Sequence, residues 1–504
     1  MLNPAKVKNI AVSHNGNVQY KQDQHEMLVQ YAIGLVYGKD SFYESFDTSL
    51  SEMKALITRM AINEKNCEFI ANVILFVRNE IGLRTLPIVM VVEFANALRN
   101  NKFQWKPLRY LVTETIQRAD DITEMFAYAE QIFKNKKSIP LALKKGIASA
   151  FLKFDEYQMQ KYNRQNKAKK LKDVMCVTHP KPLNNAQADM FKRLLEDKLD
   201  TPYTWETVLS ANGQLNSNER KTNYELWNDL VTREGSGNLP YQAMLRNLRN
   251  IENAIIENGV NNSNDLIQRV VDKLTNEKTL ERMKLFPWSF IKAYDSVQST
   301  QFKAAINNAA ELSAKHIPKL GNKIWIILDE SGSMDGSYMS IVKPMTHAAN
   351  LTSALVKSAT LHNAFQLKIT KFATSASNFN CTSPSGLIPL AKDIERSASG
   401  GGTNIGAAID EYDNIGFVPD CVIVLSDMQV DRLNGYSKHK LRELENQIPL
   451  KLAFNLHTYN STPLTNKQGW IQFSGWSDRL FQYLNLKTDS GIAQRLWDNP
   501  LYQF

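Results

Sequence analysis

Three oxygen-bearing side chains at alternate positions, Asp329, Ser331 and Ser333, lie in the segment DESGSM directly after an apolar run. In an open α/β sheet, ligands bind in the loops that leave the carboxyl ends of the strands. The D-x-S-x-S spacing in a tight, glycine-containing loop lets one carboxylate and two hydroxyls converge on a hard cation, because Mg²⁺ prefers oxygen ligands. Taken alone, the pattern also fits an acid and serines that cap the next helix.

Two further loops strengthen the metal hypothesis. Thr403 follows three glycines in SGGGTNIG, and Asp427 follows the apolar run VIVL. Together these residues resemble, in family order, the metal-ion-dependent adhesion site of von Willebrand factor A domains. The resemblance implies that a divalent cation, Mg²⁺ or else Mn²⁺ or Ca²⁺, binds there and leaves a coordination position for an acidic group of a partner protein. The metal ligands that it implies are Asp329, Ser331, Ser333, Thr403 and Asp427.

An enzymatic reading of the same loop is weaker. A strand followed by an acidic loop with Mg²⁺ also describes aspartyl phosphotransferases, but those enzymes need a second acid two residues after the nucleophile, and Ser331 occupies that position. The serines also lack the G-x-S-x-G elbow of α/β hydrolases. We therefore expect no enzymatic activity.

A basic run is the second chemical feature. Residues 161–172, KYNRQNKAKKLK, hold six cations and no acid. Such a composition suits phosphate binding, with a tyrosine available to stack on a base, although a solvated surface explains many short basic runs. Arg246 and Arg249 are weaker candidates, since they share one helix face and are equally explained by solvation or by pairing with an acid.

The elements that position these residues differ between the two parts of the chain. From Lys323 onward, the apolar runs KIWIILDE, QLKITKFAT, CVIVLSD and LKLAFNLH alternate with helical stretches, first at 339–361 and later at ELENQIP and DRLFQYLNL. This alternation predicts a doubly wound α/β domain with a parallel sheet. Before about residue 318 the apolar periodicity is helical almost throughout. Prolines typical of helix starts stand at Pro87, Pro107, Pro140, Pro240 and Pro287.

Many short helices over more than 250 residues favour stacked helix pairs over a single bundle. We therefore predict a multidomain protein, with an all-α array at 1–318 and an α/β domain at 319–504. The excess of positive charge lies in the first part, at +8 against +1 for the second. A basic balance alone is weak support for nucleic-acid binding.

Several segments of the first part resemble the TROVE module of the Ro autoantigen family. These are residues 11–45, 78–95, 239–251 and 285–297, together with 144–182, which matches the stretch that carries much of the family's RNA contact. The resemblance implies a ring of HEAT-like helical repeats followed by a von Willebrand A domain. It also implies RNA contacts from the basic run and beyond it, by Lys161, Tyr162, Arg164, Gln165, Lys167, Lys169, Lys170, Lys172 and His179.

On this resemblance we expect a cytoplasmic, monomeric ribonucleoprotein component that binds a small structured, Y-like noncoding RNA and the single-stranded 3′ ends of misfolded RNAs. An acidic protein ligand or an exonuclease would bind at the metal site. The alternative is a protein-interaction scaffold that acts through the metal-dependent domain. We find no signal peptide and no apolar run long enough to span a bilayer, and we interpret the four scattered cysteines as packing residues.

Overall fold

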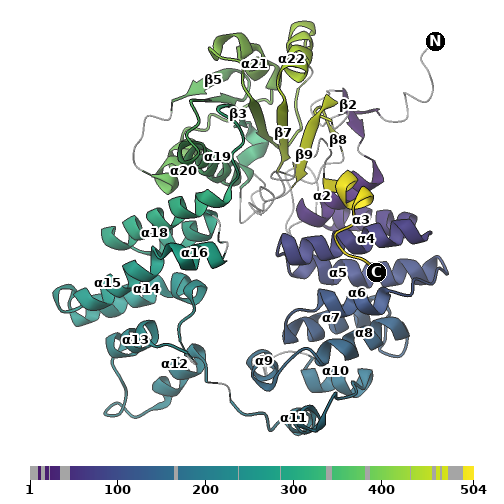
Figure 1. Cartoon of the computed structure of the whole chain (residues 1–504), viewed down its shortest axis with the longest axis vertical. Coiled ribbons are helices and arrows are strands. Elements are labelled where there is room, and N and C mark those ends of the chain that lie inside the picture. The colour runs from purple at the N-terminus through teal and green to yellow at the C-terminus, as the bar shows by residue number, and fades with distance from the viewer. Residues whose placement is uncertain are drawn as a thin grey trace.

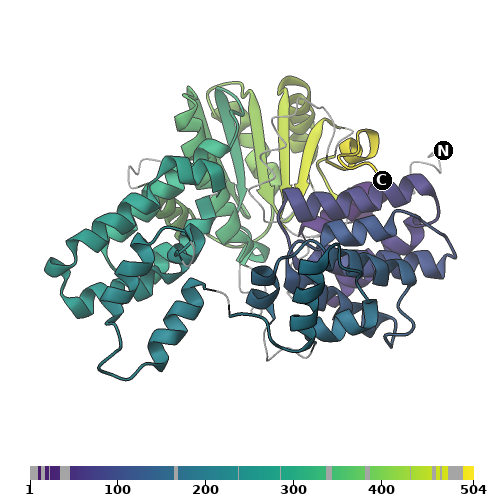
Figure 2. The same ribbon diagram turned by 60° about the horizontal axis from the view of Figure 1, so that its bottom comes forward.

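The computed structural model describes the chain apart from residues 1–9, 13–17, 22, 35–45, 164–168, 202, 236–237, 284, 286, 336–342, 381–385, 432, 457–460, 466–467 and 475–491. Helices form two arms, and an α/β domain lies across one end of both (Figure 1). The chain runs down the first arm, passes from α11 to α12, runs up the second arm and enters the α/β domain (Figures 1 and 2).

The first arm consists of short helices that follow one another closely. Its elements are α2 (Gln24–Gly34), α3 (Phe46–Met60), α4 (Glu64–Leu75), the π-helical turn η1 (Phe76–Glu80), α5 (Thr85–Asn100), α6 (Leu108–Thr115), α7 (Ala119–Ile132), α8 (Leu141–Phe151), α9 (Glu156–Tyr162), α10 (Leu171–Thr178) and α11 (Asn185–Leu195). Helices that are two apart in chain order pack side by side, such as α3 on α5 and α6 on α8, and together they build an elongated stack.

The second arm continues the stack up to the α/β domain. It contains α12 (Trp205–Gln214), α13 (Asn223–Thr232), α14 (Tyr241–Asn258), η2 (Val260–Asn262), α15 (Asn264–Leu274), α16 (Glu277–Met283), η3 (Pro287–Phe290), α17 (Ile291–Ser296), α18 (Thr300–Ser313) and η4 (Ala314–His316). The predicted boundary at residue 318 lies between η4 and the first strand of the large sheet, which begins at Lys323.

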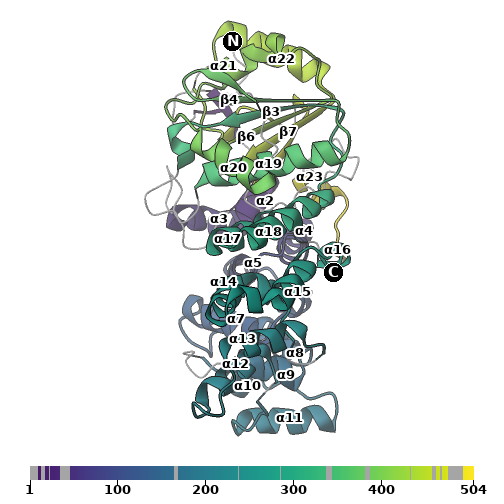
Figure 3. The same ribbon diagram turned by 90° about the vertical axis from the view of Figure 1, so that its left-hand side faces the viewer.

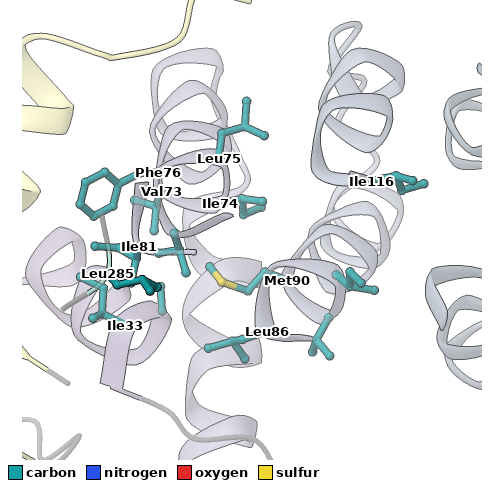
Figure 4. Packing of buried hydrophobic residues seen from close by; sticks show 14 of the residues in the cluster. Ile33, Val73, Ile74, Leu75, Phe76, Ile81, Leu86, Met90, Ile116 and Leu285 are labelled. Carbon is teal, nitrogen blue, oxygen red and sulfur yellow. The ribbon is translucent and has the colours of Figure 1, made fainter. Parts of the chain in front are cut away.

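Local sequence explains where these helices begin and which faces they bury. Pro107, Pro140 and Pro240 stand at helix N-caps, as predicted. Asn63 accepts a hydrogen bond from the backbone N–H of Asn66 at 2.9 Å, which satisfies one of the free donors at the start of α4. Apolar residues at helical spacing line the buried faces. In Figure 4, Val73, Ile74, Leu86 and Met90 lie in the shared apolar layer of the first arm.

The α/β domain is built on a six-stranded sheet of order β5-β4-β3-β6-β7-β9. Its strands are β3 (Lys323–Asp329), β4 (Gln366–Phe372), β5 (Ala376–Phe379), β6 (Cys421–Ser426), β7 (Leu450–Asn455) and β9 (Trp470–Ser474). The four predicted strands are the four central ones, and they run parallel. The expectation of an all-parallel sheet is wrong, because β5 pairs antiparallel with β4 at the edge.

Both faces of this sheet are covered. Along β3, Ile324, Ile326 and Leu328 pack on the side of the helical arms, whereas Trp325 and Ile327 pack in a second core on the opposite side. The covering helices are α19 (Pro344–Leu361), α20 (Leu387–Arg396), α21 (Ile405–Asp410) and α22 (Gly435–Gln447), with short turns η5 (Gly332–Asp335) and η6 (Glu411–Asn414). Figure 3 shows α19 and α20 between the sheet and the arms. Burial on both faces explains why the central strands read as continuous apolar runs.

The α/β domain contacts both ends of the helical array. On the side of the first arm, α2 packs against β9 and against the C-terminal helix α23 (Ile492–Asp498). On the side of the second arm, α18 packs against α20. The polypeptide therefore follows a closed course, with the α/β domain bridging the arms at one end and the α11–α12 connection joining them at the other (Figure 1).

The last residues of the chain reinforce the first of these contacts. The side chain of Asn72 accepts a hydrogen bond from the backbone N–H of Tyr502 at 2.8 Å and donates one to its carbonyl at 3.1 Å. The ring of Phe504 lies 5.3 Å from that of Trp105, between ring centres. The C-terminal tail is thus fixed onto the first arm.

Some features differ from expectation or lie outside the described residues. A small sheet of β1 (Ile10–Val12), β2 (Val18–Lys21) and β8 (Ser461–Thr462) interrupts the predicted helical character of the first part. The predicted helix at 339–361 begins at Pro344 within the described residues, and the predicted spacer DRLFQYLNL lies outside them. Cys176 is exposed, which contradicts its reading as a packing residue. No described helix is long and apolar enough to cross a membrane.

Candidate metal and RNA sites

The predicted metal ligands lie in three loops at the carboxyl edge of the central strands. Asp329 ends β3, and the loop after it carries Ser331 and Ser333. Thr403 precedes α21, and Asp427 directly follows β6. All five side chains are buried. The strand order reverses at this point, since β4 lies on one side of β3 and β6 on the other, which is where open α/β sheets bind ligands.

Hydrogen bonds join the first and third of these loops. One carboxylate oxygen of Asp329 accepts from the backbone N–H of Ser331 at 2.9 Å, and the other accepts from the hydroxyl of Ser426 at 2.5 Å. The hydroxyl oxygens of Ser331 and Ser333 lie 3.2 Å apart. Burial, and then the negative charge of the nearby Asp427 carboxylate, raise the pKa of Asp329 to about 7.

Backbone hydrogen bonds fix the glycine loop against the first loop. Gly332 donates to the carbonyl of Gly401 at 3.0 Å, and Gly400 donates to the carbonyl of Glu330 at 3.0 Å. Asp431 then holds Thr403 from the other side, because its carboxylate accepts from the Thr403 backbone N–H at 3.1 Å while its own N–H donates to the Thr403 carbonyl at 2.8 Å. The second loop is thereby attached to both others.

A buried ion pair supports the same loops. Lys371 on β4 lies 2.6 Å from the carboxylate of Glu330, and the two side chains are 7% and 5% exposed. The Ser399 hydroxyl donates to the Glu330 carboxylate at 2.8 Å, and Lys371 donates to the carbonyl of Ser397 at 2.7 Å. Sequence reasoning did not identify this pair, nor Ser426 and Asp431, because their partners are distant in the chain.

The chemical type of the ligand atoms indicates which cation could bind at this edge of the sheet. Within the described parts of the chain, no three or more His, Cys, Asp and Glu side chains cluster as a metal site. The five predicted residues instead offer two carboxylates and three hydroxyls, all through oxygen, which fits a hard divalent cation and excludes a thiolate or imidazole site. Two neighbouring buried carboxylates repel each other, and a bound cation would relieve that repulsion.

The predicted RNA contacts lie at the far end of the first arm. Lys161 and Tyr162 end α9, and Lys169 and Lys170 precede α10. Arg164, Gln165 and Lys167 lie outside the described residues. The described members of the set share one region, since α9 and α10 both pack against α7.

Not all of these cations are equally available. Lys169 lies 2.7 Å from the carboxylate of Glu130, and Lys172 is paired with Asp197, which raises the pKa of Lys172 and lowers that of Asp197. Among the residues that the structure describes, Lys161 and Lys170 have no ion-pair partner. These two cations are therefore the better candidates for phosphate contacts.

Tyr162 is held by a cationic neighbour. The guanidinium of Arg118 lies 4.4 Å from the centre of the Tyr162 ring, and Asp120 fixes that guanidinium through two hydrogen bonds of 3.0 Å each. His179 is exposed and adopts a left-handed conformation with φ of 49° at the end of α10. Its backbone geometry is that of a helix C-cap, which accounts for its position without an RNA contact.

The fold and these sites define a class of protein, a helical-repeat array closed by a doubly wound α/β domain. The TROVE domain family model matches residues 13–197 and 192–365. The chain therefore belongs to the TROVE-domain family, the family of Ro-type RNA-binding proteins that its sequence resembles. The second match runs past residue 318 and includes β3 and α19.

Individual relatives agree with this membership. The crystal structure of the Deinococcus radiodurans RO (RSR) protein is similar with a TM-score of 0.60, covering 92% of this chain and 99% of that one at 16% identity. Telomerase protein component 1 of Mus musculus is 23% identical in an alignment of 314 residues that covers 46% of this chain and 11% of the relative, and the Rattus norvegicus protein is similar to the same extent. The chain thus matches about a tenth of the length of these two relatives.

Proposed function

We propose that this protein binds RNA without catalysing a reaction, holding a small structured noncoding RNA and sampling the single-stranded 3′ ends of defective RNAs. The observation that carries the proposal is membership in the TROVE-domain family. The basic segment supports it, because Lys161 and Lys170 have no ion-pair partner among the described residues, and the amino group of Lys161 lies 5.9 Å from the centre of the Tyr162 ring. The cytoplasm is the compartment that we propose for this activity.

The proposed mechanism is electrostatic. Lys161 and Lys170 would neutralise backbone phosphates, which gives binding that tolerates many sequences and weakens as salt increases. Tyr162 would stack on a base, in an orientation maintained by the Arg118 guanidinium. Sequence-tolerant recognition of this kind suits a protein that samples many RNAs instead of reading one sequence.

The closed course of the chain adds a requirement for a free end. We propose that the arms and the α/β domain form a ring of HEAT-like repeats, so that a single strand enters by threading. An RNA whose 3′ end is base-paired offers no single strand to thread, so the proposal predicts that it binds more weakly. The contact between α2 and β9 and the attachment of the C-terminal tail to Asn72 support a ring that stays closed while a strand is threaded.

We also propose that the α/β domain is of the von Willebrand A type and that Asp329, Ser331, Ser333, Thr403 and Asp427 hold a divalent cation, with Mg²⁺ preferred over Mn²⁺ and Ca²⁺. When bound, the cation supplies a Lewis-acidic position for a carboxylate of a partner protein, such as an exonuclease. The protein's own residues hold the three loops in register. The all-oxygen donor set and the hydrogen bonds between the loops support this assignment.

A paired comparison of variants tests the RNA proposal. We expect Lys161→Glu with Lys170→Glu to abolish high-affinity binding of a fluorescent single-stranded RNA, and Asp329→Ala to leave it intact. The control is Lys106→Glu with Lys136→Glu, which changes the net charge of the same arm equally at exposed positions outside the basic segment 161–172. If Asp329→Ala abolishes binding of a protein partner while RNA binding is weak in every variant, the chain is instead a scaffold acting through its metal site.

A further inference from the structure

The second arm contains a cavity of about 490 Å³ that none of the sites above uses. It lies between α14 and α17, which pack against each other below the α/β domain (Figure 3). Helix α14 lines it with Gln242, Leu245 and Arg246, whose i, i+3 and i+4 spacing puts all three on one face. Its volume lies within the range of roughly 300–1,000 Å³ typical of small-ligand sites.

The opposite wall adds a second cation and a hydroxyl donor, Ser289. Helix α17 contributes Lys292, Ala293 and Ser296, and η3 contributes Ser289. Lys292 and Arg246 are both exposed, and neither has an ion-pair partner among the described residues. The cavity therefore presents two unneutralised positive charges from two different elements.

The acidic residue nearest to Lys292 on the same helix is already paired with a lysine outside the cavity. Asp295, on the same short helix as Lys292, is paired with Lys392 of α20. The ring of Tyr294 lies beneath that same lysine, 4.9 Å from its amino group to the ring centre. These contacts attach one side of α17 to the α/β domain and leave the cations on the cavity side without a carboxylate of their own.

The chemistry of the walls identifies a class of ligand. A guanidinium, an ammonium, an amide and the Ser289 hydroxyl can donate hydrogen bonds, and together with two positive charges they match the oxygens of a phosphate; the Ser296 hydroxyl instead donates to the carbonyl of Ala293 at 2.8 Å. Leu245, Leu285 and Ala293 are buried and give the cavity an apolar floor, on which a base can pack. A nucleotide unit offers both of these groups, whereas inorganic phosphate offers only the first.

We propose that this cavity binds one phosphate-bearing nucleotide unit of a single-stranded RNA, as a second contact on the arm opposite the basic segment. The RNA source of the ligand rests on the proposed function, whereas the nucleotide chemistry of the cavity does not. The site gives the bound strand an anchor on each arm, so that both arms contribute to its affinity.

The test uses the full-length chain and two variants matched in charge. Arg246→Gln with Lys292→Gln removes both cavity cations, and Lys278→Gln with Arg282→Gln removes two exposed cations from α16, neither of which lines the cavity. Each protein is titrated with a fluorescein-labelled oligouridylate at two salt concentrations. Adenosine monophosphate is titrated separately by saturation-transfer NMR.

Loss of one phosphate contact lowers the salt slope for a single strand by about 0.7. Between roughly 50 and 200 mM salt, the wild-type protein should therefore lose about 2.6-fold more affinity than the cavity variant. The control should keep the wild-type slope, and adenosine monophosphate should contact the wild-type protein and the control but not the cavity variant.

Other outcomes separate the cavity from the proposed function. Equal RNA slopes in the cavity variant and the wild-type protein, with no cavity-dependent contact by adenosine monophosphate, overturn the proposal. A cavity-dependent contact by the mononucleotide without any effect on RNA overturns the RNA source and makes the ligand a free nucleotide. If the wild-type protein does not bind RNA, the proposed function fails, and the mononucleotide titration alone decides the chemistry of the cavity.

Discussion

Replacing Lys371 by methionine tests how the candidate metal edge is held together. Lys371 and Glu330 form a buried ion pair at 2.6 Å, and each member also bonds to the segment that leads into the glycine loop, at Ser397 and Ser399. The substitution keeps most of the volume of the side chain but leaves the Glu330 carboxylate buried without its cation. The loss of stability then comes from the unpaired, buried charge of Glu330 and not from an empty space left by the side chain.

The expected magnitude follows from the burial of both groups. Removing one partner of a buried pair costs about 3–5 kcal/mol, because the remaining charge stays desolvated without compensation. For a domain of the size of the α/β part, 1 kcal/mol shifts the melting temperature by about 2–4 °C, so Lys371→Met should lower it by about 6–20 °C. Combining Glu330→Gln with Lys371→Met should recover most of the loss, since no unpaired charge remains.

The assay is thermal unfolding followed by hydrogen exchange, with exchange read from peptides that cover β3 and β4. The matched control is Lys368→Met, the same substitution on the same strand at a part-exposed position without a described ion pair. If Lys371→Met costs no more than this control, or if the double variant is as unstable as the single one, the ion pair does not hold the loops and our reasoning is wrong.

Three further predictions concern the loops, a half-buried histidine and the C-terminal tail. Gly401→Ala should destabilise the α/β domain by about 1–3 kcal/mol and Gly400→Ala by less. An added Cβ at Gly401 (φ +109°) would lie 2.8 Å from the Thr374 hydroxyl, whereas an added Cβ at Gly400 (φ +68°) would have no neighbour within 4 Å. Equal melting temperatures of the two variants would contradict this prediction. Burial lowers the pKa of His347 to about 3, so below the ordinary histidine pKa of about 6.5 the unfolded chain binds more protons than the folded chain. Lowering the pH from about 7 to 5 should therefore cost the wild-type protein about 2 kcal/mol of unfolding free energy that the His347→Gln variant does not lose. Unfolding measured as a function of pH tests this prediction. Asn72→Ala removes the two hydrogen bonds to the backbone of Tyr502 and leaves those of the Tyr502 hydroxyl with Asn79 and Glu80. Carboxypeptidase should then digest the tail about tenfold faster or more, a rate that would stay unchanged if the tail did not depend on Asn72.

The sequence was sufficient for the parts of the fold that are governed by burial. Central strands β3, β6 and β7 are buried along nearly their whole length, so they stood out as apolar runs. Edge strand β5 was missed because its residues are half-buried or exposed and carry no apolar pattern. The β1–β2 hairpin was missed because β2 pairs with β8, more than 400 residues later in the chain.

The candidate sites divide in the same way. Motif spacing and strand position were enough to predict that the five candidate metal ligands lie at one edge of the sheet. By contrast, the run 161–172 suggested a uniform set of cations, and only the fold shows that Lys169 meets Glu130 and Lys172 meets Asp197. The charge that a segment offers to a ligand depends on long-range neighbours, which local composition does not contain.

The central claim is that the protein binds RNA by a free single-stranded end. The most direct measurement is a titration with a structured RNA that has a single-stranded 3′ tail, against the same RNA with its tail paired in a duplex, at two salt concentrations. Our account predicts tight, salt-dependent binding that requires the free tail. Equal affinity for the two RNAs, or negligible binding to both, would contradict it.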